Sequence, residues 1–564
     1  HDETEYARER ECRMRIICEA DDDDVGFDDV SGKSLPAREV RKARKEEIQW
    51  FHNKGVYHKI LRSEAKKNGW PIIGVRWVDV NKGDDTNPNY RSRLVAKEFK
   101  RLGLDDDDLF AGTPPLEALK LLISAAATTD EVGNNDRCML IADVSRAFFE
   151  AVATRDVCVE IVDEDRTPED DRLDRVGKLD LSMYGTRDAP ANWQEEIAKN
   201  MRSWKFTRGL YNSCTYRHRD HDLQVLVHGD DFVAVGSLEG VTWFKDMLEG
   251  RFKIKYSILG SRTGLEREGR ILNRIIRVTD DGWEYEADQR HAELIVEALG
   301  LNDCKSVKTP GEDLQPCEAE EDAKELSEGD ATGFRKVAAR ANYLAMDRPD
   351  IQYPVKELCR GMCKPTVGHK KKLKRLGRYL RGRPRVVFKY DWQEKQDDLT
   401  VFTDSDWAGC KITARSTTGG VIALGHHIVK TWSRTQKTIA LSSAEAELTA
   451  MVKGTCEGLG VSSLMKDWDQ KKYLVMMGDS TAALGVIRRK GAGKLRHVNI
   501  GMLWVQEKRD GGEVEYRKVD GKENPADLMT KYLTGIMLDA HAGRLCLRFR
   551  SGRAEKASLV TKDV

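Results

Sequence analysis

The most constraining feature of this chain is a pair of adjacent aspartates, Asp230 and Asp231, between two short apolar segments. Residues 225–227 and 232–235 are nearly continuous apolar runs, which is typical of strands packed inside a protein. The sequence therefore predicts a hairpin in which residues 228–231 form the turn. Two carboxylates held at such a place repel one another and need a cation. A solvated surface turn rich in Asp and Gly is the alternative interpretation.

A third carboxylate, Asp143, follows the apolar segment 139–142. Because side chains alternate along a strand, only a turn lets both Asp230 and Asp231 approach one site. Three carboxylates on neighbouring strands suit two Mg²⁺ ions about 3.5–4 Å apart, the arrangement used for in-line phosphoryl transfer. We predict Asp230 to be the primary ligand and Asp231 the weaker one.

A second set of acids lies beyond residue 400, each at the end of a predicted strand or near the start of a predicted helix. These acids are Asp404, Glu447, Asp479 and Asp527. Ser442 and Glu445 have the spacing of a capping box, which gives Glu445 a structural task. Glu447 lies about 200° further round that helix and can face inward. Taken singly, each acid also fits a purely structural interpretation, because acids are common at such positions.

Length and charge limit the classes of protein to which the chain can belong. Its 564 residues suffice for about three or four domains. The 94 basic and 94 acidic side chains cancel, so a polyanion would have to bind to local patches. No stretch approaches the ~20 apolar residues of a membrane span, so no membrane partner is expected. The 12 scattered cysteines lack zinc or disulfide spacing and favour a reducing compartment.

The pattern along the chain predicts a multidomain protein of the α/β and α+β classes. Residues 1–40 mix charges with few apolar positions and are predicted to be a disordered acidic tail. The further predicted boundaries are 41–310 for a first globular region, 311–395 for a linker and basic helical connection, 396–535 for a second globular region and 536–564 for a basic C-terminal tail. Because the chain begins at His1 without Met, we expect it to be a piece of a longer polypeptide.

Four segments resemble, in order and spacing, the reverse transcriptase of Ty1/copia-type retrotransposons. They are residues 90–97, 142–149, 181–190 and 227–231. The resemblance implies a right-hand polymerase with palm, fingers and thumb. It places the first catalytic acid of the palm on Asp143 and the paired acids on Asp230 and Asp231.

The same resemblance implies a nucleotide-binding set made of Arg93, Lys97, Phe148, Tyr184 and Gly185. Arg93 and Lys97 would neutralise the incoming triphosphate, and Tyr184 and Gly185 would line the nucleotide pocket and the template. For these four residues, a solvated strand edge or a structural turn is the alternative. Phe148 occupies the position of the family's steric gate, where a ring crowds a 2′-hydroxyl and favours deoxynucleotides.

His228 and Gly229 precede the paired acids, where the family usually has an aromatic residue and a small aliphatic one. The shape of the turn near the primer end can therefore differ. Both metal ligands remain, and Gly229 suits a strained turn because glycine tolerates positive φ. We interpret the departure as variation rather than inactivation.

The sequence around the second acid set is similar to the copia-type ribonuclease H, notably over residues 442–447 and 523–527. This resemblance implies a mixed-sheet ribonuclease H fold in which four ligands surround two Mg²⁺ ions. The ligands are Asp404, Glu447, Asp479 and Asp527. Asn499 departs from the family, which commonly has Asp there, but none of the four ligands depends on it.

Between the two regions, residues 370–389 contain ten Lys or Arg and no acid. A solvated helix face or a basic amphipathic helix on a membrane would account for them. Their place between a polymerase and a nuclease instead favours a surface that follows the phosphates of an RNA·DNA hybrid, with binding that weakens steeply with salt. The predicted contacts are Lys370, Lys371, Lys372, Lys374, Arg375 and Arg378.

Together these features predict the reverse transcriptase and ribonuclease H portion of a copia-type Pol polyprotein. It would use two Mg²⁺ ions per active site, with Mn²⁺ as the alternative ion, and act on an RNA template, a primer, deoxynucleoside triphosphates and RNA·DNA hybrids. An intracellular location, in a cytoplasmic particle or the nucleus, is expected. The alternatives are an inert relic that binds nucleic acid and a chain in which only the nuclease works. All seven predicted acids are present, which favours activity.

Overall fold

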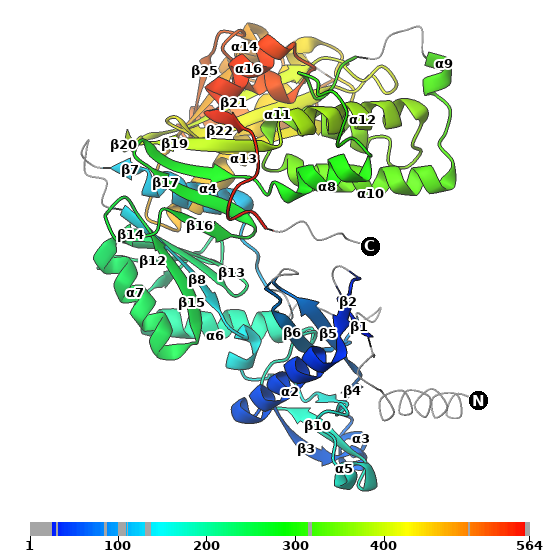
Figure 1. The fold of residues 1–564 in the computed structure, drawn as a ribbon. Coiled ribbons are helices and arrows are strands. Elements are labelled where there is room, and N and C mark those ends of the chain that lie inside the picture. Colours follow the sequence, from blue (N-terminus) through cyan, green and yellow to red (C-terminus); the bar gives the residue numbers. More distant parts are fainter. Residues whose placement is uncertain are drawn as a thin grey trace. The chain divides into compact units, whose positions relative to one another are not determined.

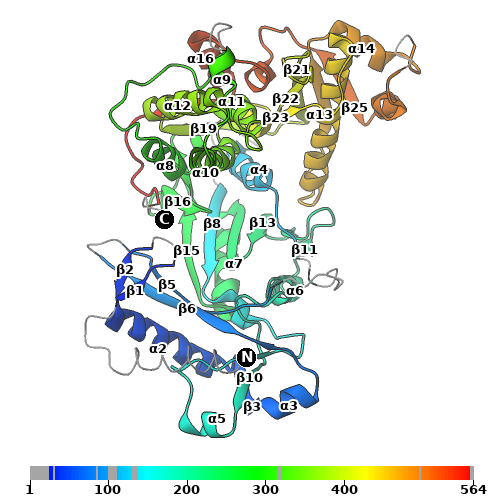
Figure 2. The ribbon, with the colours of Figure 1, turned by 90° about the vertical axis from the view of Figure 1, so that its right-hand side faces the viewer.

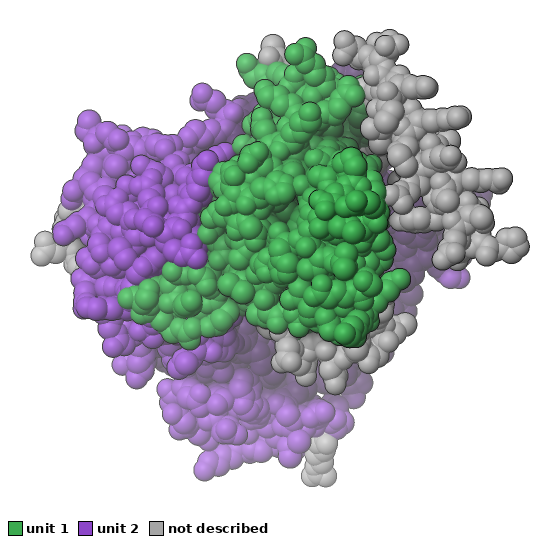
Figure 3. Space-filling model, turned by 90° about the horizontal axis from the view of Figure 1, so that it is seen from below, with its two compact units in different colours: residues 1–111, 144–203, 561–564 green, residues 112–143, 204–560 purple. Residues whose placement is uncertain are grey.

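The structure is a computed structural model, shown in Figure 1. It describes residues 25–29, 32–83, 87–99, 109, 111–129, 137–313, 319–493 and 497–558. The chain divides into two compact units, coloured separately in Figure 3. Unit 1 consists of residues 1–111, 144–203 and 561–564, and unit 2 of residues 112–143 and 204–560.

Unit 1 contains a long helix, α2 (Ala37–Lys54), and a hairpin made of β5 (Val75–Asn81) and β6 (Tyr90–Ala96). Ile48 and Phe51 of α2 are buried, so one face of this helix covers the core of the unit. A four-stranded sheet has the order β3-β10-β9-β4. The other elements are β1 (Val25–Phe27), β2 (Ser34–Pro36), β3 (Tyr57–Leu61), α3 (Arg62–Lys67), β4 (Ile72–Ile73), η2 (Ala147–Glu150), β9 (Cys158–Val159), α5 (Pro168–Arg172), β10 (Arg175–Leu179) and α6 (Ala189–Ser203).

Residues 25–29 and 32–40 are folded, which corrects the prediction that they belong to a disordered tail. β1 and β2 pair antiparallel, and α2 begins directly after β2. Asp28 is buried and accepts a hydrogen bond from the backbone N–H of Asn81 at 2.7 Å. The prediction of disorder was based on the acidic composition of this segment. It was wrong here because Asp28 binds a backbone N–H group of β5 instead of remaining solvated. Residues 1–24 of the predicted tail lie outside the described residues.

The first of three large sheets in unit 2 carries the first acid set. Its strands have the order β11-β12-β13-β14-β8-β15, and α4 and α7 both contact β14. β13 and β14 are buried along most of their length, as the apolar runs predicted. The elements are α4 (Leu116–Ala126), β8 (Arg137–Val144), β11 (Thr207–Arg208), β12 (Thr215–His218), β13 (Leu223–His228), β14 (Asp231–Ser237), α7 (Leu238–Arg251) and β15 (Ile254–Leu259).

The second sheet has the order β16-β17-β18-β19-β26, so a strand near the C-terminus completes it. β26 (Leu547–Arg550) pairs antiparallel with β19 (Arg385–Asp391). The predicted basic tail over 536–564 is therefore folded in its described part, because it contains buried apolar residues such as Leu538 and Leu545. The other strands and the connecting helices are β16 (Glu268–Ile271), β17 (Arg274–Thr279), β18 (Gly282–Glu286), α8 (Arg290–Ala298), α9 (Ala319–Asp322), α10 (Glu328–Ala345), α11 (Pro349–Cys359) and α12 (Val367–Gly382).

The third sheet is mixed, with the order β23-β22-β21-β24-β25. β21 pairs in parallel with β24, and β24 with β25, whereas β22 is antiparallel to both of its neighbours. The elements are β21 (Asp398–Asp406), β22 (Thr417–Leu424), β23 (His427–Thr435), α13 (Ser443–Lys466), β24 (Tyr473–Gly478), α14 (Thr481–Arg488), η4 (Ile500–Leu503), α15 (Trp504–Asp510), β25 (Val514–Lys518), η5 (Pro525–Met529) and α16 (Gly535–Arg544). The short strands β7 (Thr128–Thr129) and β20 (Gln393–Glu394) pair with each other. No helix in the described part of the chain has the length and apolar character needed to cross a membrane.

Three consecutive residues after α13, Asp467, Trp468 and Asp469, attach the third sheet to the first. Figure 2 shows α13 running from the third sheet toward β11 of the first sheet. The Asp467 carboxylate accepts hydrogen bonds from the backbone N–H groups of residues 210–212 at 2.8–3.0 Å. Trp468 is buried and donates its indole N–H to the carbonyl of Val225 in β13 at 3.3 Å. Since β13 leads directly into the aspartate pair, this contact fixes the first acid set relative to the third sheet.

We expect Asp467→Ala to lower the free energy of unfolding by about 2–3 kcal/mol, because hydrogen bonds to charged groups contribute roughly 1.5–3 kcal/mol each and are only partly additive. Asp469→Ala is the matched control, and its effect should be much smaller because its hydrogen-bonded partner Arg219 is exposed, water screens that pair, and its second partner, Arg217, lies farther away at 3.7 Å. Chemical denaturation of both variants beside the unaltered chain measures the difference. Equal destabilisation by the two substitutions would contradict the importance given to Asp467.

Candidate active sites

The first candidate site is the β13–β14 hairpin together with β8. β13 continues to His228 and β14 begins at Asp231, so the turn consists of Gly229 and Asp230. It is two residues long instead of the predicted four, because His228 and Asp231 pair across the hairpin. Gly229 has φ +64°, as the first central position of a type II′ turn requires.

Strand register brings the three acids of this set together. Asp143 and Asp231 lie directly opposite one another in the pairing of β8 with β14, and Asp230 precedes Asp231 in the turn. Burial raises the pKa of Asp231 to about 7, with further contributions from the charges of Asp230 and Asp143. Oxygen donors that repel one another in this way fit a divalent cation such as Mg²⁺ chemically.

Four of the predicted nucleotide-binding residues lie together in unit 1. The guanidinium carbon of Arg93 lies 4.9 Å from the ring centroid of Tyr184, and the Phe148 ring meets the same ring edge-on at 4.9 Å. Gly185 has φ +86°, and a Cβ at this position would lie 2.1 Å from the carbonyl oxygen of the last residue of β6. Only glycine allows this close approach. Lys97 directly follows β6.

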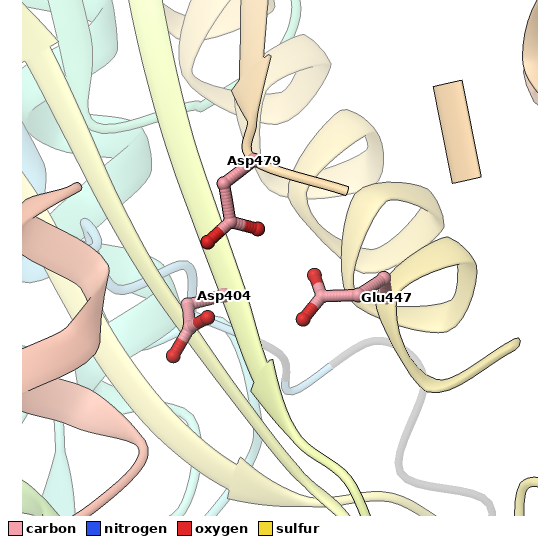
Figure 4. A group of neighbouring side chains, drawn as sticks. All are labelled: Asp404, Glu447 and Asp479. Carbon is pink, nitrogen blue, oxygen red and sulfur yellow. The ribbon is translucent and has the colours of Figure 1, made fainter. Parts of the chain in front are cut away.

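The second candidate site combines acids from two strands of the third sheet and from α13 (Figure 4). Asp404 lies on β21, Glu447 on α13, and Asp479 directly after β24. One carboxylate oxygen of each lies within 4.8 Å of the other two. The parallel pairing of β21 with β24 brings Asp404 and Asp479 to the same end of the sheet.

The start of α13 gives two glutamates different tasks, as the sequence predicted. The Ser442 hydroxyl accepts a hydrogen bond from the backbone N–H of Glu445 at 3.3 Å. The Glu445 carboxylate accepts from the backbone N–H of Leu441 at 2.9 Å, one residue earlier than a capping box requires. Glu447 instead accepts from the backbone N–H of Ser405 at 3.1 Å, which holds its carboxylate beside β21.

The fourth predicted ligand, Asp527, lies on η5 beside Asp404. The Lys531 ammonium lies 2.9 Å from the Asp527 carboxylate and 4.0 Å from that of Asp404. The Thr530 hydroxyl donates a hydrogen bond to Asp404. Sequence reasoning missed Lys531 and Thr530, although the i,i+4 spacing of Asp527 and Lys531 is a signal of their pairing.

Burial and mutual repulsion raise the pKa values of the acids in the second site. The pKa of Glu447 rises to about 9, through burial first and then the charges of Asp404 and Asp479. That of Asp404 rises to about 6, through burial and then the charge of Asp527. Closely spaced, buried oxygen donors of this kind are the set that a hard divalent cation prefers, so the residues fit Mg²⁺.

The predicted phosphate-binding residues of α12 are largely engaged within unit 2. Four of the six have partners there: Lys370 with Asp330 (2.8 Å), Lys371 with Asp322 (2.9 Å), Arg375 with Glu312 (2.5 Å) and Arg378 with the backbone carbonyl of Lys305 (2.8 Å). The other two are Lys372 and Lys374. A hybrid would have to share or displace these partners, so the composition of α12 alone overstates the charge available to bind phosphate.

Comparisons with known proteins show what the chain is similar to. Residues 61–312 match the family model described as "Reverse transcriptase (RNA-dependent DNA polymerase)". The chain is 25% identical over 518 residues to the retrovirus-related Pol polyprotein from transposon TNT 1-94 of Nicotiana tabacum, an alignment that covers 87% of this chain and 36% of that protein. It is 26% identical over 496 residues to the corresponding polyprotein from transposon RE1 of Arabidopsis thaliana, with coverage of 84% and 32%. A solved foamy viral protease-reverse transcriptase in complex with RNA/DNA hybrid aligns with a TM-score of 0.46 at 10% identity, over 92% of this chain and 61% of that one.

Residues 61–312 belong to the reverse transcriptase family, and over most of its length the chain is similar to the Pol polyproteins of copia-type retrotransposons. It spans about a third of the length of these curated relatives. The family match contains Asp143, Asp230 and Asp231 and ends before the second candidate site. The predicted fold class, a multidomain α/β and α+β protein with a mixed-sheet domain after the polymerase, agrees with the structure.

Without a divalent cation, the unaltered chain should lose stability as the pH rises from about 5 to 9. Glu447 binds its proton more tightly in the folded chain, where its pKa is about 9, than in the unfolded chain, where it is near 4.5. The stabilisation that this proton gives is complete below pH 4.5 and disappears as the pH approaches 9. We expect Glu447→Gln to reduce this decline and raise the stability at pH 8 by roughly 1–3 kcal/mol, since one pKa unit corresponds to about 1.4 kcal/mol.

Thermal unfolding with EDTA and with Mg²⁺, at pH 6 and pH 8, measures this effect. Mg²⁺ should stabilise the unaltered chain at pH 8 more than it stabilises Glu447→Gln. The exposed Glu394, changed to Gln, is the control and should behave as the unaltered chain does. The same pH dependence in Glu447→Gln and the unaltered chain would contradict the assignment.

Proposed function

We propose that the chain is an RNA-directed DNA polymerase that also cleaves the RNA strand of RNA·DNA hybrids. The observation that carries the proposal is the presence of two separate groups of neighbouring carboxylates in one chain that matches the reverse transcriptase family: Asp231 opposite Asp143 with Asp230 beside it, and Asp404 with Glu447 and Asp479. The first group lies within the family match, and the second lies on a mixed sheet beyond it.

In the polymerase, Asp143, Asp230 and Asp231 would hold two Mg²⁺ ions. When bound, Mg²⁺ would lower the free energy needed to form the attacking 3′-alkoxide and would stabilise the leaving pyrophosphate. Arg93 and Lys97 would bind the triphosphate, whose charge they neutralise. The Phe148 ring, which packs edge-on against Tyr184, would exclude a 2′-hydroxyl and so select deoxynucleotides.

In the nuclease, Asp404, Glu447, Asp479 and Asp527 would hold the same kind of ion, with Mn²⁺ as the alternative. These acids lie on β21, α13 and η5 and directly after β24, and together they would position the attacking water and the scissile phosphate. Lys531 would keep the Asp527 carboxylate oriented toward the site, because the two form an ion pair at 2.9 Å.

The substrates we propose are an RNA template, a primer, deoxynucleoside triphosphates and RNA·DNA hybrids. The basic residues of α12 would contribute to hybrid binding, chiefly through Lys372 and Lys374. We further propose that the protein acts inside the cell, in a cytoplasmic particle or the nucleus, as the family resemblance implies.

A nuclease-only protein is the second candidate, and the observation that favours it is the departure at His228 and Gly229. The turn itself keeps its pairing, because His228 lies opposite Asp231 in the hairpin register. Polymerase function therefore remains our first proposal.

Deoxynucleotide incorporation on a primed RNA template with Mg²⁺, measured beside cleavage of a preformed hybrid, tests the proposal. We expect Asp230→Asn to reduce incorporation by at least about a hundredfold and to spare cleavage, because two-metal catalysis depends on its carboxylate ligands. Asp479→Asn should do the reverse. An unaltered chain that cuts the hybrid but incorporates nothing would overturn the polymerase claim and support the nuclease-only alternative.

A further inference from the structure

One face of α2 holds the short segment that contains Phe148. Residues 47, 50, 51 and 54 have the i, i+3, i+4, i+7 spacing that places side chains on one face of a helix. Each of them contacts η2 or the residue before it. Glu47 and Trp50 contact Arg146, Phe51 contacts Phe149, and Lys54 contacts Glu150.

The most buried polar contact on this face is the pair formed by Glu47 and Arg146. Glu47 is 1% exposed, and its Oε2 accepts a hydrogen bond from Arg146 Nε at 2.8 Å. The guanidinium carbon also lies 4.6 Å from the ring centroid of Trp50. The other carboxylate oxygen of Glu47 has no hydrogen-bond partner among the described residues. A buried carboxylate that is only half satisfied is costly, so stability alone does not account for this pair.

The backbone at Arg146 is in an unfavourable conformation for a residue with a Cβ. Its φ of 56° and ψ of 47° lie in the left-handed region, which glycine adopts far more easily. Arg146 is the N-cap of η2, and its carbonyl accepts the hydrogen bond from the backbone N–H of Phe149 at 3.0 Å. The direction in which the chain enters η2, and hence the position of Phe148, is set at this residue.

Other contacts on the same face keep η2 against α2. The Phe51 and Phe149 rings meet edge-on at 4.9 Å, and both side chains are buried. The Lys54 ammonium binds the Glu150 carboxylate at 2.5 Å at the far end of η2. Arg146 is therefore the one strained point in a segment that is otherwise held by apolar and ionic contacts.

We propose that α2 sets the position of Phe148, and that Glu47 acts as a positioning residue for sugar selection by holding Arg146 in its left-handed conformation. The inference rests on the proposed function, in which Phe148 excludes the 2′-hydroxyl. It makes sugar selection depend on a helix that lies before residue 61, where the family match begins.

The test compares incorporation of dCTP and CTP by the full chain on a primed RNA template, expressed as the ratio of the two kcat/KM values. Glu47→Ala should lower this ratio about tenfold, which corresponds to about 1.4 kcal/mol. The double variant Glu47→Ala/Arg146→Gly should restore it to within about twofold, because glycine adopts the left-handed conformation without an anchor. Glu46→Ala, at the exposed neighbouring position of α2, is the control and should leave the ratio unchanged.

Phe148→Val separates failure of this inference from failure of the proposed function. If Phe148→Val lowers the ratio but Glu47→Ala leaves it unchanged, or if the double variant does not restore it, the role of Glu47 is overturned and the polymerase proposal survives. If the unaltered chain incorporates neither nucleotide, the polymerase proposal itself fails. Glu47→Gln, which keeps the size of the side chain, should lower the ratio in the same direction, and thermal unfolding of each variant verifies that the chain, including unit 1, is folded.

Discussion

Asp143 and Asp231 face each other across two paired strands, and the register of β8 with β14 holds these like charges side by side. The pairing continues from this point to Ser237 and Arg137, through strands that are buried along most of their length. Because side chains alternate along a strand, a slip of one residue would send one of the two acids to the opposite face of the sheet. The apolar pairing thus stabilises an arrangement that the carboxylates, by themselves, would oppose.

In the second site, too, the packing of strands and a helix holds carboxylates together against their mutual repulsion. The parallel register of β21 and β24 places Asp404 and Asp479 at one end of the third sheet, and α13 adds Glu447. Asp467, at the other end of α13, binds backbone donors near β12. One helix therefore carries an acid of the second site at its start and attaches the third sheet to the first at its end. In unit 1, α2 has a comparable task, since one of its faces holds the segment with Phe148.

The acids of both sites could be predicted from the sequence because each follows an apolar strand or begins a helix, and these patterns are local. Family resemblance supplied the roles that we propose for Phe148 and Tyr184, which composition and spacing do not reveal. The length of the turn was mispredicted, because extension of a strand to His228 depends on pairing with its neighbour and not on propensity. The folding of residues 25–29 and 32–40, and of the described part of the C-terminal segment, was also missed. Both depend on distant partners, as the hydrogen bond of Asp28 to Asn81 and the pairing of β26 with β19 illustrate.

The central claim is that two separate groups of carboxylates each hold divalent cations. Anomalous scattering from Mn²⁺ in crystals of the full chain bound to an RNA·DNA hybrid would locate the ions directly. The account predicts anomalous density at Asp143, Asp230 and Asp231, and separately between Asp404, Glu447 and Asp479. Density at only one of these places, or at neither, would contradict it.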